Sequence, residues 1–207
     1  MYSLECVFPP SSPVITPAEV AARLDLGEAK ADVLAPFVLA SERYFDGKDG
    51  YLGRALVTQT WDMYFDAAAF PEGVVRVPLP PMISIEELAF EDRDGTLQVV
   101  EADRYRLERG KPAIIKPIDF RLQDYRSFRL RFRCGYGDKG EDIPEPIRQA
   151  IVLKAAHLRS ISRPDVQLMS ETVNGVGSSM WSVSESVGVA YERAAANLVS
   201  GYRIVVL

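Results

Sequence analysis

At 207 residues the chain is long enough to bury one or two hydrophobic cores. Its composition, 47% hydrophobic and 26% charged, is that of a globular protein, and no apolar run approaches the roughly 18 residues that a membrane-spanning helix needs. Cys6 and Cys134 are the only cysteines, which excludes a disulfide framework and a cysteine-rich metal site. Met1 to Pro10 lacks the basic start and long apolar run of a signal peptide, so we expect an intracellular, reducing compartment.

The net charge of −5 argues against a dedicated nucleic-acid binder, but the charge is spread unevenly. Residues 76–135 carry 12 basic and 10 acidic groups and form the only net-positive part of the chain. This change of sign predicts a different surface role for the middle of the protein.

The chain begins with a proline-rich stretch, residues 1–14, which we expect to be an extended arm. A helix follows, with Thr16 as N-cap, Pro17 at its first position and Glu19 at the capping-box position, and Gly27 as its stop. A second helix is predicted over about 28–44. Apolar residues recur in it at three- and four-residue spacing and predict one buried stripe, with a kink at Pro36: Val33, Phe37, Ala40 and Tyr44.

After a loop over 46–53 the period changes from 3.6 to 2. Strand-like runs then follow at short spacing, over 56–61, 74–77, 83–90, 97–100, 105–107, 113–116 and 127–134. Asp94-Gly95 between two of these runs is a hairpin signal. The pattern is typical of an antiparallel sandwich or small barrel.

Helical periodicity returns after Pro144 and continues to about Ile161. Residues 162–182 are polar, contain glycine and show no period, so they are predicted to be a mobile loop. A last helix is expected over about 184–200, with an apolar face made by Val187, Tyr191, Ala194, Ala195 and Leu198. The predicted fold class is therefore α+β. Residues 15–53 and 144–201 form a small helical bundle, residues 54–137 form an inserted antiparallel β sandwich or barrel-like subdomain, and residues 202–207 form a tail.

Few motifs point to chemistry. Residues 135–140 fit G-x-G-x-x-G, but Pro144 and nearby acids separate this loop from the next helix, so an ordinary turn is expected. His157, the only histidine, has no nucleophile or metal partners in its sequence context. Glu86 and Glu87 are adjacent on a strand and should point to opposite faces, while Asp92 and Asp94 flank a turn. We therefore predict no catalytic residue, no metal and no cofactor.

One strand has a strongly basic face. Phe128, Leu130 and Phe132 alternate with Arg129, Arg131 and Arg133, so one side is apolar and the other carries an arginine stripe. The stripe is either a solvated face balanced by nearby acids, or a surface that faces DNA or a neighbouring subunit.

Several segments, in order, resemble the head–tail connector family of tailed phages, in the branch with a β insertion that also occurs in gene transfer agents. The similarity lies in residues 53–61 (GRALVTQTW), Phe70-Pro71 and residues 77–80 (VPLP), with residues 15–20, 91–95, 134–137 and 143–151 in the expected order and 198–203 as a weaker match. It covers residues 14–161, and the polar stretch 162–182 is longer than in the family.

This resemblance implies a non-enzymatic structural adaptor at the neck of the particle, assembled in the bacterial cytoplasm. It implies a ring, with twelve copies, beneath the portal protein and above the next tail-side (stopper or head-completion) protein, around the channel through which double-stranded DNA passes; no membrane partner is expected. Two other functions stay open: an accessory or chaperone protein of particle assembly, and a small enzyme with a site in residues 162–182.

Two further sets of residues are candidate contact sites. Met180 and Trp181 are apolar residues in a polar loop and are predicted to anchor assembly. The apolar tail either folds back on its own bundle or adds as a strand to a partner. Because the family's C-terminal end lies toward the portal, the resemblance favours portal docking by Tyr202, Arg203, Ile204, Val205, Val206 and Leu207.

Overall fold

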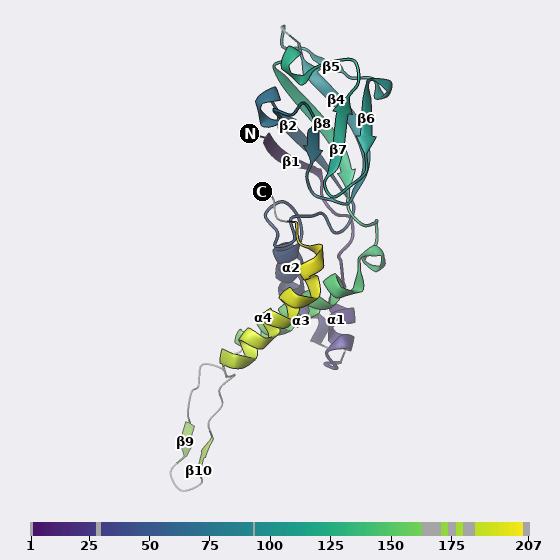
Figure 1. Cartoon of the computed structure of the whole chain (residues 1–207). Coiled ribbons are helices and arrows are strands. Elements are labelled where there is room, and N and C mark those ends of the chain that lie inside the picture. The colour runs from purple at the N-terminus through teal and green to yellow at the C-terminus, as the bar shows by residue number, and fades with distance from the viewer. Residues whose placement is uncertain are drawn as a thin grey trace. The chain divides into compact units, whose positions relative to one another are not determined.

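The computed structural model describes residues 2–27, 30–92, 94–162, 171–173, 177–179 and 185–204. The protein has an α+β fold, as predicted, with helices and antiparallel sheets (Figure 1). It divides into a β unit, comprising residues 1–13, 46–143 and 204–207, and a helical unit, comprising residues 14–45 and 144–203. Residues 1–13 and 46–53 thus belong with the strands, whereas the sequence assigned 46–53 to the helical bundle.

The β unit contains two antiparallel sheets. The larger has the order β1-β2-β8-β4-β5, formed by Tyr2–Phe8, Gln59–Phe65, Ser127–Cys134, Met82–Glu91 and Leu97–Val99. The smaller has the order β3-β7-β6, formed by Val75–Val77, Ala113–Pro117 and Tyr105–Glu108. Short 3-10 turns lie at Ala67–Ala69, Ala102–Arg104, Leu122–Asp124 and Gly140–Asp142.

A single apolar core contains residues from both sheets. Met63 and Leu130 of the larger sheet and Ile115 of the smaller are fully buried in it. In β8 every second residue is buried, from Phe128 to Cys134, because successive side chains of a strand point to opposite faces. The alternation read from the sequence therefore identified the inward face of β8 correctly.

The N-terminal segment is a strand rather than a free arm. Tyr2–Phe8 pairs with β2, and Leu4 lies opposite Met63. Leu4 and Tyr2 pack against the core of the β unit. The prolines that follow mark where this strand ends; they gave no sign of the pairing itself.

The helical unit is built around α3, Glu145–Ile161. Helices α2 (Ala31–Phe45) and α4 (Glu185–Val199) both pack against α3, and α1 (Pro17–Arg23) packs against α2. From Pro146 to Ser160 no residue of α3 is exposed. The predicted N-cap of α1 is present, since the Thr16 hydroxyl accepts a hydrogen bond of 3.2 Å from the Glu19 amide. A 3-10 turn, Ser200–Tyr202, follows α4.

The polar stretch 162–182 contains two short strands that sequence reasoning missed. β9 (Glu171–Val173) pairs antiparallel with β10 (Gly177–Ser179), with Thr172 opposite Ser178. Three-residue strands made largely of polar residues carry too little periodicity to be recognised in sequence. Met180 and Trp181 lie outside the described residues.

The buried face of α2 differs from the prediction. The buried residues are Leu34, Val38, Ser41 and Phe45. Each lies one position after a member of the predicted stripe, of which Val33, Ala40 and Tyr44 are exposed and Phe37 is half-buried. A shift of one residue turns the buried face by roughly 100° around the helix axis.

The prediction for α4 is only partly correct. Ala195 belongs to the predicted apolar face and is buried, and Val199, which was not part of that face, is buried as well. Ala194 and Leu198 of the predicted face are exposed. Both helices are apolar over more than one face, so periodicity alone could not select the side that packs against α3.

Candidate interaction surfaces

The arginine stripe of β8 lies on the outer face of the larger sheet and is paired with acids from the neighbouring strands. Arg131 donates two hydrogen bonds of 2.7 Å to the carboxylate of Asp62 on β2, and these bonds raise the pKa of Arg131. The Asp62 side chain is only 4% exposed, so Arg131 is paired with a carboxylate that is nearly buried. Arg129 forms an ion pair with Glu87 on β4.

Arg133 is held more loosely. It lies 3.9 Å from Glu86 and 3.8 Å from Asp138, and its side chain is 41% exposed, the largest fraction of the three arginines. The stripe is thus largely balanced by acids, with Arg133 at its open end. Whether it faces DNA or a neighbouring subunit stays a prediction.

The two adjacent glutamates on β4 do not point to opposite faces. The register of β4 against β8 shifts between Ile85 and Glu87, and this bulge inserts Glu86 as an extra residue. Glu86 therefore reaches Arg133 while Glu87 reaches Arg129. Both carboxylates therefore face the arginine stripe.

The glycine motif 135–140 is a packing turn. A Cβ on Gly135 would lie 2.7 Å from the backbone of Thr58, and the Gly137 carbonyl accepts a hydrogen bond of 2.9 Å from the Thr58 amide. The Asp142 carboxylate accepts a hydrogen bond of 3.0 Å from the Lys139 amide. A carboxylate of the chain therefore occupies the place where a phosphate-binding loop would present its amides to a ligand.

The other titratable residues singled out in the sequence, Asp92 and His157, make contacts within the fold. Asp92 accepts hydrogen bonds from the Thr96 and Asp94 amides in the β4–β5 hairpin; the bond from Thr96 contributes most to lowering the pKa of Asp92. His157 packs between α3 and α4, where a Cβ on Gly188 would lie 2.9 Å from its ring. The Glu192 carboxylate lies 3.9 Å from its Nε2.

One polar network in the β unit was not foreseen. Asp46 accepts hydrogen bonds from the Leu56 amide at 2.7 Å and from the Gln59 amide group, whose oxygen accepts from the Trp61 indole at 3.0 Å. Burial raises the pKa of Asp46, and these hydrogen bonds oppose that rise. The network ties the segment that enters the β unit to the start of β2.

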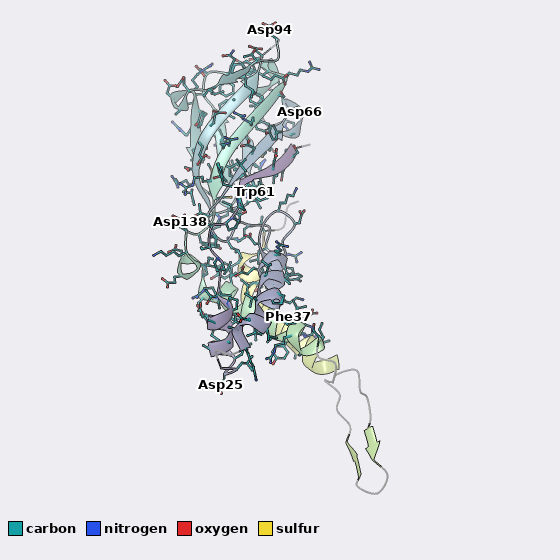
Figure 2. The ribbon with its side chains drawn as sticks, turned by 180° about the vertical axis from the view of Figure 1, so that it is seen from behind. Asp25, Phe37, Trp61, Asp66, Asp94 and Asp138 are labelled. Carbon is teal, nitrogen blue, oxygen red and sulfur yellow. The ribbon has the colours of Figure 1, made fainter. Side chains whose placement is uncertain are left out.

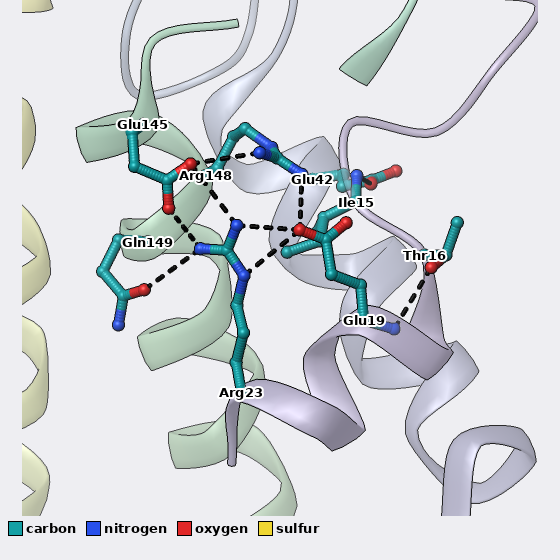
Figure 3. Close-up of polar contacts among 8 residues, drawn as sticks. All are labelled: Ile15, Thr16, Glu19, Arg23, Glu42, Glu145, Arg148 and Gln149. Atoms are coloured by element: carbon teal, nitrogen blue, oxygen red, sulfur yellow. Dashed lines mark hydrogen bonds and ion pairs between the residues drawn. The ribbon is translucent and has the colours of Figure 1, made fainter. Parts of the chain in front are cut away.

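A second network joins α1 to α3 (Figure 3). The Arg23 guanidinium donates to Glu19 at 2.7 Å and pairs with Glu145, which lowers the pKa of Glu145. Arg148 donates to Glu19 at 2.5 Å and to Glu145 at 3.0 Å, so two arginines and two glutamates alternate. The spacing within each helix, Glu19–Arg23 and Glu145–Arg148, is local, but no local pattern reveals the contacts between the helices, because those join residues more than 100 positions apart in sequence.

The described part of the C-terminal tail contacts the chain itself. Tyr202 ends the 3-10 turn after α4, and the Ile204 amide donates a hydrogen bond of 2.9 Å to the Leu52 carbonyl. Gly53 lies against Ile204 closely enough that a Cβ there would come within 3.1 Å of the Ile204 carbonyl. Val205, Val206 and Leu207 lie outside the described residues.

Within the part of the chain that the structure describes, no three His, Cys, Asp or Glu residues are placed to hold a metal ion. No helix among those residues is long and apolar enough to cross a membrane. Burial raises the pKa of the Cys134 thiol and removes it from the set of reactive groups.

No family model matches the sequence, and no curated protein is significantly similar to it. The fold, in contrast, is similar to chains of gene transfer agent (GTA) particles over almost the whole length. The neck of an empty GTA particle, computed with C6 symmetry, contains a chain with a TM-score of 0.68 at 17% identity, covering 99% of this chain and 97% of that one. The virion of a native GTA particle contains one with a TM-score of 0.69 at 18% identity, covering 99% and 96%. The neck of a native GTA particle, computed with C12 symmetry, contains one with a TM-score of 0.60 at 19% identity, covering 99% and 97%. The protein therefore shares the fold of these particle chains.

Proposed function

We propose that this chain is a structural component of the neck of a tailed-phage-like particle, and more narrowly the adaptor that joins the portal to the tail. The observation that carries the proposal is the similarity of fold over 99% of the chain to neck chains. A match of this extent includes both the β unit and the helical unit, and the combination is more specific than either unit alone.

The geometry supports a function in assembly rather than in chemistry. The candidate acids on β4 are paired with arginines, and the glycine turn is filled by Asp142. In the proposed assembly the chain forms a ring of twelve copies around the DNA channel, contacts the portal on one side and the next tail-side protein on the other, and uses no cofactor. Modest contacts suffice in such a ring, because every contact is repeated around the circumference.

The C-terminal tail is the proposed portal-binding element. The Ile204 amide is already bonded to Leu52, so we assign the contact with the portal to Val205, Val206 and Leu207. Deleting these three residues should remove binding to the portal, while deleting residues 203–207 should in addition release the Leu52 segment and lower stability. Unchanged portal affinity after the shorter deletion would refute the tail assignment and leave the adaptor function open.

Arg133 is the proposed contact of the arginine stripe with passing DNA or with a neighbouring copy, since it keeps the most exposed side chain of the three. DNA in transit requires weak contacts, and a half-exposed arginine shared between two acids provides a weak one.

Electron microscopy of purified portal mixed with the full-length chain tests the adaptor function directly. The expected image is an added ring on the tail-facing side of the portal, at a stoichiometry that native mass spectrometry gives independently. A chain that stays monomeric and unbound at micromolar concentrations of both proteins would overturn the proposal.

A further inference from the structure

Two helices of the helical unit each expose an apolar stripe. On α2, Val33 is 59% exposed, and Pro36 and Ala40 lie on the same exposed side one and two turns later. On α4, the exposed residues Ala190, Ala194 and Leu198 follow one another at four-residue spacing. We call these two surfaces the α2 stripe and the α4 stripe.

The α2 stripe is apolar surface that the helical unit does not use. The helix already buries Leu34, Val38 and Phe45 toward α3, so the stripe beginning at Val33 is a second apolar face about 100° away. Leu39, 49% exposed, extends the apolar surface at its edge. A monomer gains no stability from such a face, because its side chains remain in water.

Both stripes are made largely of small and medium-sized side chains. The α2 stripe consists of Val33, Pro36 and Ala40, and Ala190 and Ala194 of the α4 stripe leave the helix backbone open to close approach. Their lengths also agree, since Val33 to Ala40 spans roughly 10 Å and Ala190 to Leu198 roughly 12 Å of helix. Two helices can therefore approach each other closely along the stripes.

Charge does not oppose this contact. The exposed residues Asp32 and Arg43 border the α2 stripe, and the exposed residues Glu192 and Arg193 border the α4 stripe. Each border has one acid and one base, so the two surfaces can approach without bringing a block of like charge together.

The two helices that carry the stripes lie on different sides of α3. α3 is covered on all sides and separates most of α2 from α4. Within this unit α4 lies in front in Figure 1, and α2, marked by Phe37, lies in front in Figure 2, which is turned by 180°. A closed ring requires this arrangement, in which each copy carries two different and complementary surfaces.

We infer that the α2 stripe of one copy packs against the α4 stripe of the next copy and forms the subunit contact of the ring. The inference rests on the proposed function, because a ring supplies the second copy. A pair of helices in contact over two to three turns buries too little surface for a stable dimer in dilute solution. The contact therefore gains its strength from ring closure, or from the portal that gathers the copies.

The experiment uses the full-length chain with Val33→Glu in the α2 stripe, Ala194→Glu in the α4 stripe, and Ile118→Glu as a matched control. Ile118 is 61% exposed in the β unit, so the control also places a charge on an exposed apolar position. Native mass spectrometry over a range of concentrations, and electron microscopy on portal, report assembly. Circular dichroism verifies that every variant is folded.

Each stripe variant should weaken self-association about tenfold or more, because a carboxylate in an apolar helix contact loses its hydration. Ile118→Glu should assemble like the unaltered chain. A mixture of the two stripe variants is the sharpest measurement: each retains the surface that the other lacks, so one intact contact forms between them. Because a single contact of this size is weak, the mixture should give heterodimers only at the high concentrations at which the unaltered chain begins to associate, and it should give no rings.

The outcomes separate this inference from the proposed function. Rings of the unaltered chain that persist with Val33→Glu and Ala194→Glu overturn the stripe contact and leave the adaptor proposal standing. Loss of rings without heterodimers in the mixture, at concentrations at which the unaltered chain associates, also overturns it, because complementary surfaces must rescue each other. If the unaltered chain forms no ring even on portal, the adaptor proposal fails and the inference fails with it.

Discussion

The β unit and the helical unit differ in how well their sequence pattern identified the buried face. In β8 the alternation of Phe128, Leu130 and Phe132 with arginines selected the inward side correctly. In α2 the three- and four-residue spacing selected a face that is exposed, and the buried one lies a residue further along. A strand has only two faces, and in β8 one of them is charged, which decides between them. A helix that is apolar over more than half of its circumference offers several faces, and tertiary contacts decide which one is buried.

The largest expected effect tests the β side of this comparison. Replacing Leu130, which is fully buried between the two sheets, by alanine should lower the free energy of unfolding by about 3–5 kcal/mol, because it leaves a cavity in a closed core. Urea unfolding followed by circular dichroism gives the value. A loss below 1 kcal/mol would mean that the sheets do not enclose this residue.

The next effect tests the helical side. Leu34→Ala should cost about 2–4 kcal/mol, since Leu34 is fully buried. Val33→Ala, one position earlier and mostly exposed, should change stability by less than about 0.5 kcal/mol. The same unfolding measurement on both variants checks the order. A larger loss from Val33→Ala than from Leu34→Ala would return the buried face of α2 to the position that the sequence predicted.

A smaller effect separates the arginines of the stripe. Arg131→Ser should lower stability by about 1–3 kcal/mol, because it leaves the nearly buried Asp62 carboxylate without its two charged hydrogen bonds. Arg133→Ser is the control and should cost less than about 0.5 kcal/mol, given its exposure and its long contacts. If both variants lose the same stability, Arg131 and Arg133 contribute equally to one ion-pair network, and Arg133 is not the weakly held member of the stripe.

The smallest effect is a dependence on pH. Burial raises the pKa of Asp46 in the fold, so the folded protein holds this proton more tightly than the unfolded chain does. Protonation of Asp46 therefore favours the fold at low pH, and this contribution declines as the pH rises above the usual aspartate pKa of about 3.9. Asp46→Asn has no carboxyl group to titrate at this position, so its stability does not show that decline. The difference in stability between the variant and the unaltered chain should move in favour of the variant between pH 4 and 7, measured by thermal unfolding at several pH values; a constant difference would contradict the raised pKa.

Local signals in the sequence were sufficient for the fold class and for the order of the helices and of the strands from β2 to β8. Thr16 and Pro17 mark a helix start by capping chemistry that acts within one turn, and the alternation of β8 is legible in eight residues. Pairing between distant segments was not legible. The strand at Tyr2–Phe8 became recognisable only through its partner β2, and the bulge at Glu86 only through the register against β8.

The candidate surfaces divide in the same way. The arginines at 129, 131 and 133 were evident from composition, but their acidic partners lie on two other strands. The network around Asp46 and the cluster around Arg148 depend on residues brought together by folding, and a single sequence gives no sign of such meetings. The surplus apolar face of α2 was present in the sequence as an excess of hydrophobic positions, which was interpreted as core.

The ion-pair cluster between α1 and α3 has a consequence for the order of folding. Arg23 and Glu145 are 122 positions apart, and residues 46–143 of the β unit lie between them. During synthesis α1 and α2 emerge before most of the β unit, but α3, which packs against α2, is made only after β8, the last strand of that unit. Because contacts of long sequence separation form slowly, we expect the strands to close first and the helices to wait, with their apolar faces in water, for α3 to appear. For a protein whose helices carry more apolar surface than one copy can bury, this interval is when premature contacts between unfinished chains are most costly.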